Sequence, residues 1–292
     1  MTNMLITLFV LAAGVIITVV YVLNYKPRRH SKVKDIYAEG LDLLITGRRK
    51  SAYKNFKEII EKDSNNIKAY IRLGQVLREG GNPGQALKVH KSLRHRKGLT
   101  FYEQIELHKN LALNYYKLSN LDAAINELHQ ILKLEKNSEW ALSKLTAFYR
   151  EKHDWAKAGD FLERYQKQVK KENQFDLALY KIQEGRILIN NKNFKDARKT
   201  FERALSICPD LAVTYYFIGN SYSSESEGAY QESINHQSSP ISKTSGNTVN
   251  MDKAKELLSK SIPMWIKYAE LRPEQAWMVI HLLKDALFAL DR

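Results

Sequence analysis

The chain repeats small residues at a distance of 34 positions, and this period restricts the possible folds more than any other feature. Four pairs share this distance: Gly40 and Gly74, Ala52 and Ala86, Ala124 and Ala158, and Gly185 and Gly219. A 34-residue period of this kind is typical of tetratricopeptide repeats, each a hairpin of two helices. One hairpin cannot bury its apolar face alone, so successive hairpins must stack. The sequence therefore predicts an all-α tetratricopeptide (TPR) solenoid superhelix of about six hairpins over residues 35–292.

The residue types fit close packing inside each hairpin. A small residue at the eighth and twentieth positions lets two helices approach, and large apolar residues fill the space beside that contact. The fifth repeat follows this pattern best, with Gly185, Leu188, Ala197, Phe201, Ala204 and Pro209. His90 occupies a large-residue position of the second repeat. We therefore expect it to be a packed core residue, the alternative being a metal ligand.

Two segments depart from the repeat. Residues 223–250 are polar and rich in Ser, Asn and Gly, which predicts a disordered insertion that splits the sixth repeat. It is either a tolerated surface insertion or a regulatory segment. The last predicted helix, residues 274–290, is apolar on most sides. We expect it either to be buried under the preceding pair or to meet another molecule.

The first segment has the composition of a membrane span. Residues 4–23 carry no charge, and a helix of this length covers about 30 Å, the thickness of a bilayer's hydrocarbon core. A cleaved signal peptide is the alternative, but a basic start and a small-residue cleavage site are missing. The sequence predicts a transmembrane anchor within residues 1–25 and a basic juxtamembrane segment over 26–34. Because the nearby cations all follow the span, the positive-inside rule predicts a single-pass inner-membrane protein with its bulk in the cytoplasm.

Motifs for catalysis or metal binding are not evident. The eight histidines form no HExxH pattern, and one cysteine, Cys208, cannot make an internal disulfide or a multi-cysteine zinc site. We expect no catalytic residues, no metal and no cofactor, and hence a protein that is not an enzyme. The net charge of +14 could suit contacts with nucleic acid, anionic lipid or acidic peptides. The charges follow the repeat spacing instead of forming a separate basic face, so we expect no nucleic-acid binding.

One face of the first helices is the predicted partner-binding groove. Positions 2, 5, 9 and 12 of each repeat share a helical face, and they include Lys68, Ile71 and Glu106. The mixture of cations with aromatic and aliphatic residues suits an extended protein segment with acidic and apolar residues. The alternative is ordinary solvated or inter-repeat packing positions. The predicted groove residues are Arg78, Lys109, Tyr116, Trp140, Arg150, Ile182, Arg186, Tyr216 and Asn220.

The first two repeats carry a family resemblance. The motif LGxxLRxxG at residues 73–81, ValHis at 89–90 and LeuThr at 99–100 resemble the lipopolysaccharide assembly protein B family of membrane-anchored TPR proteins. The resemblance implies an adaptor that couples the membrane protease FtsH to the deacetylase LpxC and so limits lipid A synthesis. Members of that family usually end in a rubredoxin-like zinc module with two CxxC pairs, which a chain with one cysteine is expected to lack. The alternative is a general scaffold for a secretion, pilus or respiratory complex.

Overall fold

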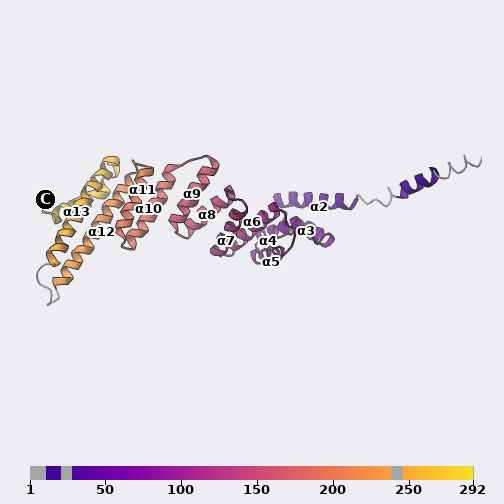
Figure 1. Ribbon diagram of the computed structural model, residues 1–292, viewed down its shortest axis with the longest axis horizontal. Helices are drawn as coiled ribbons and strands as arrows, with labels where there is room; N and C mark the ends of the chain where they lie inside the picture. The colour runs from indigo at the N-terminus through magenta and orange to yellow at the C-terminus, as the bar shows by residue number, and fades with distance from the viewer. Residues whose placement is uncertain (1–10, 21–27, 238–245, 292) are drawn as a thin grey trace, which may run out of the picture. The chain divides into compact units, whose positions relative to one another are not determined.

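A computed structural model describes residues 11–20, 28–237 and 246–291 of the 292-residue chain (Figure 1). All regular elements in these ranges are helices, which confirms the predicted all-α class. The chain divides into two compact units, residues 1–134 and 135–292. Each unit is built from consecutive antiparallel helix pairs, the arrangement that the 34-residue period predicts.

The first unit contains three hairpins. They pair α2 (Arg28–Ile45) with α3 (Arg49–Lys62), α4 (Ile67–Glu79) with α5 (Pro83–Leu93), and α6 (Phe101–Lys117) with α7 (Leu121–Leu134). Local signals set these boundaries. Gly47 and Gly81 adopt positive φ angles of 75° and 85° in the turns that follow α2 and α4. Thr100 and Glu103 form a reciprocal capping box at the start of α6.

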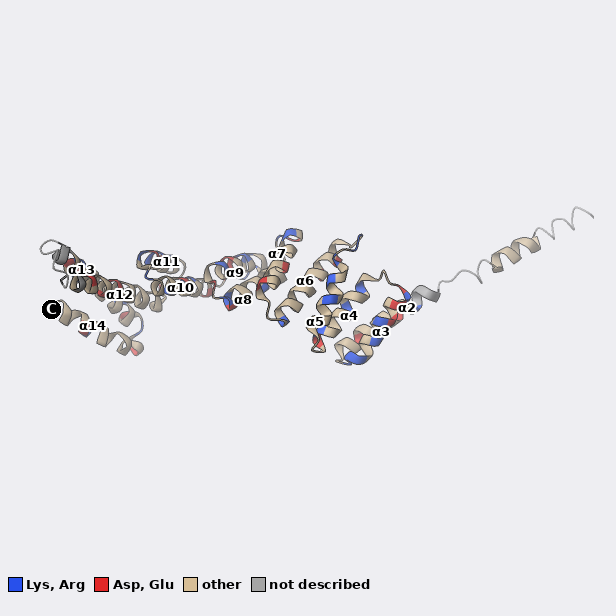
Figure 2. Cartoon of the chain, turned by 90° about the horizontal axis from the view of Figure 1, so that it is seen from below, with Lys and Arg blue, Asp and Glu red and all other residues tan. Residues whose placement is uncertain are grey.

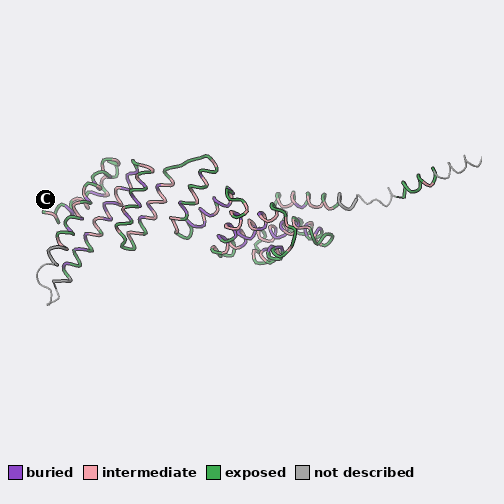
Figure 3. The backbone as a smooth tube through the Cα atoms, viewed as in Figure 1, coloured by how far each residue is buried: buried purple, intermediate pink, exposed green. Residues whose placement is uncertain are grey.

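The second unit contains three further hairpins and a final helix. They pair α8 (Glu139–Glu151) with α9 (Trp155–Val169), α10 (Gln174–Asn190) with α11 (Phe194–Ile207), and α12 (Ala212–Gln237) with α13 (Gly246–Leu271), followed by η1 (Pro273–Gln275) and α14 (Trp277–Ala289). Buried residues recur along each hairpin in Figure 3. The core is therefore a series of small clusters repeated along the chain, as a stack of hairpins requires.

Glycines on the first helices make the close contacts that the repeat pattern predicts. A Cβ atom at Gly185 would lie 2.4 Å from a ring carbon of Phe201, and one at Gly219 would lie 2.5 Å from Nε1 of Trp265. Gly74 has the same relation to His90, at 2.3 Å. The large ring on the second helix thus rests directly on the backbone of the first. The predicted role of the eighth position is confirmed in these hairpins.

The prediction of a disordered insertion at residues 223–250 is wrong over the part that the structure describes. α12 continues to Gln237 and α13 begins at Gly246, so both ends of the insertion lengthen a helical hairpin. The reason lies in small residues at helical spacing. Ser226, Ala229 and Ser233 are buried, and Ser226 donates a hydrogen bond to the carbonyl of Ala254 at 2.7 Å. A serine-rich composition here builds a close helix contact instead of a loop.

The last helix is only half covered. Val279 and Ala286 of α14 are buried in the cluster around Trp265, whereas Trp277 and Phe288 are 70% and 71% exposed. One side of α14 therefore packs on the preceding pair, and the other presents large apolar side chains.

The predicted span at residues 4–23 lies partly outside the described residues. Residues 11–20 form a helix, and most of their large side chains are exposed. Within the described ranges, no helix has both the length and the apolar character to cross a bilayer.

Candidate partner-binding surfaces

The first unit has a hollow of about 540 Å³ that is lined only by first helices and the residue capping α6. Tyr37 of α2, Ile71 of α4 and Tyr102 of α6 supply its apolar surface. We call it the first-helix hollow, and it also contains Lys68, Arg72, Thr100, Glu103 and Glu106. Three of the positions that the sequence places on the groove face, Lys68, Ile71 and Glu106, lie together here.

The two walls of the first-helix hollow carry opposite charges. Lys68 and Arg72 come from α4, and Glu103 and Glu106 come from α6. Both acids are already engaged: Glu103 accepts hydrogen bonds from Thr100 in the capping box, and Glu106 pairs with Lys109 at 3.0 Å. Lys68 is exposed, and its ammonium forms no ion pair among the described residues. Arg72 donates a hydrogen bond to Gln75 at 2.8 Å, so Lys68 is the charged group of this hollow that remains available to an incoming carboxylate.

Tyr102 is the most exposed aromatic residue of this hollow. Its side chain is 77% exposed and stacks edge-to-face on Phe101 with ring centroids 5.6 Å apart. Aromatic side chains with an apolar body and a polar tip are enriched at protein interfaces. Sequence reasoning missed Tyr102 because it lies in the first turn of α6, before the first of the four groove positions. Its exposure beside an apolar hollow could be found only from the structure.

Arg78 is a packing residue instead of a free groove cation. Its Nη1 donates hydrogen bonds to Oδ1 of Asn110 at 2.9 Å and Oδ1 of Asn114 at 3.1 Å. Burial lowers the pKa of its guanidinium below the usual value for arginine. Arg78 thus links α4 to α6 of the next repeat. This is the inter-repeat packing role that the sequence allows as the alternative to groove binding. Lys109 and Tyr116 lie further along α6, and Tyr116 is 38% exposed.

The predicted groove residues of the second unit divide between surface and core. Arg150 and Arg186 are exposed, and the guanidinium of Arg186 lies over the ring of Phe217 at 5.1 Å. Trp140 is half-buried. Ile182 is only 2% exposed and belongs to the core cluster between α10, α11 and α12. A side chain so covered cannot form part of a binding surface, so its assignment to the groove is corrected to core packing.

The remaining two predicted residues serve the hairpin of α12 and α13. Asn220 accepts a hydrogen bond through Oδ1 from Nε1 of Trp265 at 2.9 Å. Tyr216 is half-buried and packs against Tyr268 with ring centroids 5.6 Å apart. Trp265 is 1% exposed, so its indole N–H needs this acceptor. Both predicted residues therefore contribute to the internal packing of the second unit.

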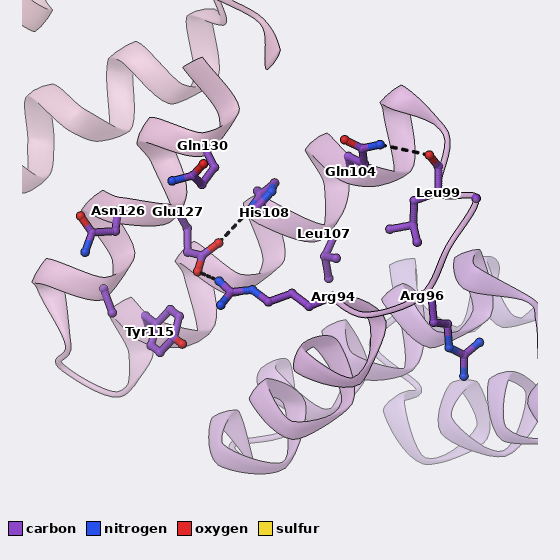
Figure 4. Close-up of a pocket in the computed structure, with 12 residues that line it drawn as sticks. Arg94, Arg96, Leu99, Gln104, Leu107, His108, Tyr115, Asn126, Glu127 and Gln130 are labelled. Carbon is purple, nitrogen blue, oxygen red and sulfur yellow. Dashed lines mark hydrogen bonds and ion pairs between the residues drawn. The ribbon is translucent and has the colours of Figure 1, made fainter. Parts of the chain in front are cut away.

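A second hollow of the first unit, of about 680 Å³, is lined by the segment that follows α5 and by residues of α6 and α7 (Figure 4). One lining residue is Glu127, whose side chain is only 6% exposed. Its carboxylate pairs with Arg94 and with Nδ1 of His108, the latter at 2.7 Å. Figure 4 shows Arg94 and His108 converging on Glu127 from two different elements. A buried carboxylate without partners would be costly. This triad therefore ties α6 and α7 to the segment that follows α5.

A metal centre has no support in the described part of the chain. Within residues 11–20, 28–237 and 246–291, no group of three or more His, Cys, Asp or Glu side chains could hold an ion. Cys208 is partly buried and packs beside the core of α10 and α11.

The described helical hairpins are those of a TPR protein. A profile of the tetratricopeptide repeat matches residues 180–211, the α10–α11 hairpin in which the sequence pattern is most complete. A solved tetratricopeptide repeat protein from Parabacteroides merdae aligns with 90% of this chain and 100% of its own length, at 15% identity and a TM-score of 0.44.

Among curated proteins, the chain is similar to lipopolysaccharide assembly protein B. The protein from Escherichia coli K12 is 24% identical over 142 residues, which are 49% of this chain and 36% of the relative. The protein from Haemophilus influenzae is 22% identical over 212 residues, 70% of this chain and 53% of the relative. These matches confirm the resemblance seen in the first two repeats. The chain spans about a third to a half of the length of these relatives.

Proposed function

We propose that this chain is a non-enzymatic TPR adaptor of envelope and lipopolysaccharide assembly, anchored in the inner membrane with its hairpins in the cytoplasm. Its similarity to lipopolysaccharide assembly protein B supports the process. The uncharged segment at residues 4–23 and the cations after it support the anchor and the orientation. As the resemblance implies, the membrane protease FtsH and the deacetylase LpxC are the proposed partners, through which the chain would limit lipid A synthesis.

The first-helix hollow is the observation that carries the adaptor role. It combines an apolar floor, the exposed ring of Tyr102 and the unengaged ammonium of Lys68. An extended partner segment could place an apolar side chain against the ring of Tyr102 and a carboxylate beside Lys68. A charged hydrogen bond of this kind is worth about 1.5–3 kcal/mol, and aromatic anchors dominate the binding energy of many interfaces. Arg150 and Arg186, exposed on the second unit, are the proposed cations of the same face there.

Affinity capture tests this proposal. The tagged full chain is purified from solubilised membranes, and its partners are quantified by mass spectrometry. The Lys68→Glu and Tyr102→Ala chains should each recover at least about tenfold less partner, because about 1.4 kcal/mol is a factor of ten. Lys117→Glu is the matched control, since Lys117 is exposed at the far end of α6. Unchanged recovery by all three chains would remove the first-helix hollow from the binding surface.

The identity of the captured proteins separates the two candidate functions. Recovery of FtsH, LpxC or other lipid A enzymes supports the envelope role. Recovery of a secretion, pilus or respiratory complex would favour the general scaffold that the TPR fold also permits.

A further inference from the structure

The positive charge of the protein is concentrated in the first unit. Residues 1–134 contain 22 Lys and Arg against 11 Asp and Glu, whereas residues 135–292 contain 24 against 21. The excess is therefore 11 in the first unit and 3 in the second, out of the total of 14. A charge distribution this uneven produces a positive potential around the first unit, which attracts anions to that part of the molecule.

Within the first unit, most of the excess lies on α3 and on α5 together with the segment that follows it. Residues 49–62, which form α3, carry five Lys or Arg against two Glu, and residues 80–102, around α5, carry five against no acid. By contrast, α6 carries two of each sign and α7 carries one Lys against two acids. Figure 2 shows several Lys and Arg segments along α3. The expectation that the charges form no separate face is therefore corrected by the way the hairpins place them.

The two groups of cations belong to adjoining segments. Nη1 of Arg96 donates a hydrogen bond to the carbonyl of Ser64 at 2.7 Å, so the segment after α5 lies against the turn that follows α3. We call α3 together with residues 88–97 the basic face. Lys88, Lys91 and Lys97 are exposed, whereas Arg94 pairs with Glu127 and the guanidinium of Arg96 lies over the ring of Tyr70. The two acids of α3, Glu58 and Glu61, are each paired with a lysine of the same helix.

The basic face follows the uncharged segment closely in the sequence, and this position indicates which kind of partner it meets. Only four residues separate the uncharged segment at 4–23 from the start of α2 at Arg28. Four residues reach about 14 Å at most when fully extended. If residues 4–23 cross the membrane, as proposed above, the first unit is held close to the bilayer surface. There, each Lys or Arg gains about 1 kcal/mol from anionic lipid, a factor of about five in binding.

We propose that the basic face docks on the phosphate groups of anionic phospholipids. The first unit would then lie against the bilayer through α3 and α5, while the first-helix hollow, lined by the other helix of each pair, stays open to partners. This inference rests on the proposed anchor but not on the identity of any protein partner.

Nanodiscs of two compositions test the proposal on the full chain. A fluorophore is attached at Ser92→Cys, an exposed position of α5, in a chain whose single cysteine is replaced by Cys208→Ser. The discs contain phosphatidylcholine alone or with phosphatidylglycerol, and both carry a headgroup spin label that quenches the fluorophore at short range. We expect at least about twofold stronger quenching in the anionic discs. The difference should disappear at about 1 M salt, where the Debye length is about 3 Å.

Matched variants assign the effect to the basic face. Lys88→Glu with Lys97→Glu should reduce quenching in anionic discs to the level of neutral discs. Lys195→Glu with Lys199→Glu changes the charge by the same amount at exposed positions of α11 and should leave quenching unchanged. A label at Glu106→Cys, in the first-helix hollow, should be quenched less than the label at Ser92→Cys.

Three results would overturn the proposal. They are equal quenching in neutral and anionic discs, quenching that survives the Lys88 and Lys97 reversals, and tighter binding of a short DNA duplex that displaces the label from the discs. A further experiment, extraction of native membranes with alkaline carbonate, distinguishes an error in the proposed anchor from an error in the proposed lipid contact of the basic face. A chain released by carbonate contradicts the anchor, whereas a retained chain without lipid-dependent quenching contradicts the basic face alone.

Discussion

Nδ2 of Asn114 donates a hydrogen bond to Nδ1 of His90 at 2.7 Å, and both side chains are fully buried. Because Oδ1 of Asn114 accepts from Arg78, its amide N–H₂ must face the imidazole. Nδ1 of His90 is then an acceptor, so the ring proton is on Nε2, which donates to the carbonyl of Ile71 at 3.1 Å. The histidine at a large-residue position of the repeat is thus a neutral core residue, as the sequence predicts.

This arrangement makes the first unit sensitive to acid. Burial is the main cause that lowers the pKa of His90 to about 4, against 6.5 for the free side chain. The folded state therefore holds fewer protons than the unfolded state between these values, and stability falls as the pH falls from about 6.5 to about 4. The loss should approach about 3 kcal/mol. Urea titrations across this range check it, and a His90→Gln chain should lose most of the pH dependence.

Removing the shared amide should destabilise the same region. Asn114→Leu deprives His90 of its donor and Arg78 of one acceptor, and it leaves buried polar groups unpaired. We expect a loss of about 2–3 kcal/mol. Hydrogen exchange should show faster opening of α4, α5 and α6. Asn126→Leu is the control, because Asn126 is exposed on α7; equal losses in both variants would contradict the network.

Two glycines in the second unit should respond in opposite ways to alanine. A Cβ at Gly185 would overlap the ring of Phe201 at 2.4 Å, so Gly185→Ala should cost about 1–3 kcal/mol. A Cβ at Gly159 would meet Tyr180 at an ordinary 3.7 Å. Gly159→Ala should therefore stabilise α9 by about 0.5–1 kcal/mol, since alanine favours a helix. Thermal unfolding of the two variants checks the signs, and a neutral Gly185→Ala would refute the close-contact argument.

The repeat period made the hairpins predictable because small and large residues recur together at one spacing. The lengths of α12 and α13 were not predictable in the same way. Their contact uses Ser226, Ala229 and Ser233, and in a linear sequence serines of this kind are as typical of a loop as of a close helix contact. The loop and the helix contact can be distinguished only when the partner helix is known, because that helix supplies the carbonyl of Ala254 to which Ser226 donates.

The groove positions were predictable as a face, but not residue by residue. Helical spacing places Lys68, Ile71 and Glu106 on one side, and they share the first-helix hollow. The same spacing includes Arg78 and Ile182, which the structure buries in contacts between helices. Which member of a stripe stays exposed depends on the neighbouring repeat, and sequence spacing within one helix does not contain that information.

The proposed anchor predicts a defined topology. A reporter that is active only in the periplasm, fused after Arg292, should stay inactive, because under the positive-inside rule the five cations that follow the uncharged segment favour the cytoplasm for that side. A cytoplasm-active reporter at the same position should be active. Replacing Lys26, Arg28 and Arg29 with Glu should weaken this preference. Full periplasmic activity of the unmodified fusion would show that the predicted orientation is wrong.

The two exposed arginines of the second unit give the remaining prediction. Arg150 and Arg186 lie on the surface of α8 and α10, and an interfacial arginine that bonds a charged acceptor contributes about 1–3 kcal/mol. Arg150→Ala with Arg186→Ala should therefore weaken partner capture by at least about tenfold.

Folding should survive this double change, because neither side chain belongs to the small-residue contact inside its hairpin. Ala158→Leu is the contrasting variant: Ala158 is 0% exposed, and a larger side chain should disrupt the pairing of α8 and α9. Melting curves separate the two effects. Full partner recovery by the double arginine variant, with an unchanged melting curve, would leave the second unit's groove face without a role. The exposed apolar side of α14 around Trp277 would then be the surface to test in that unit.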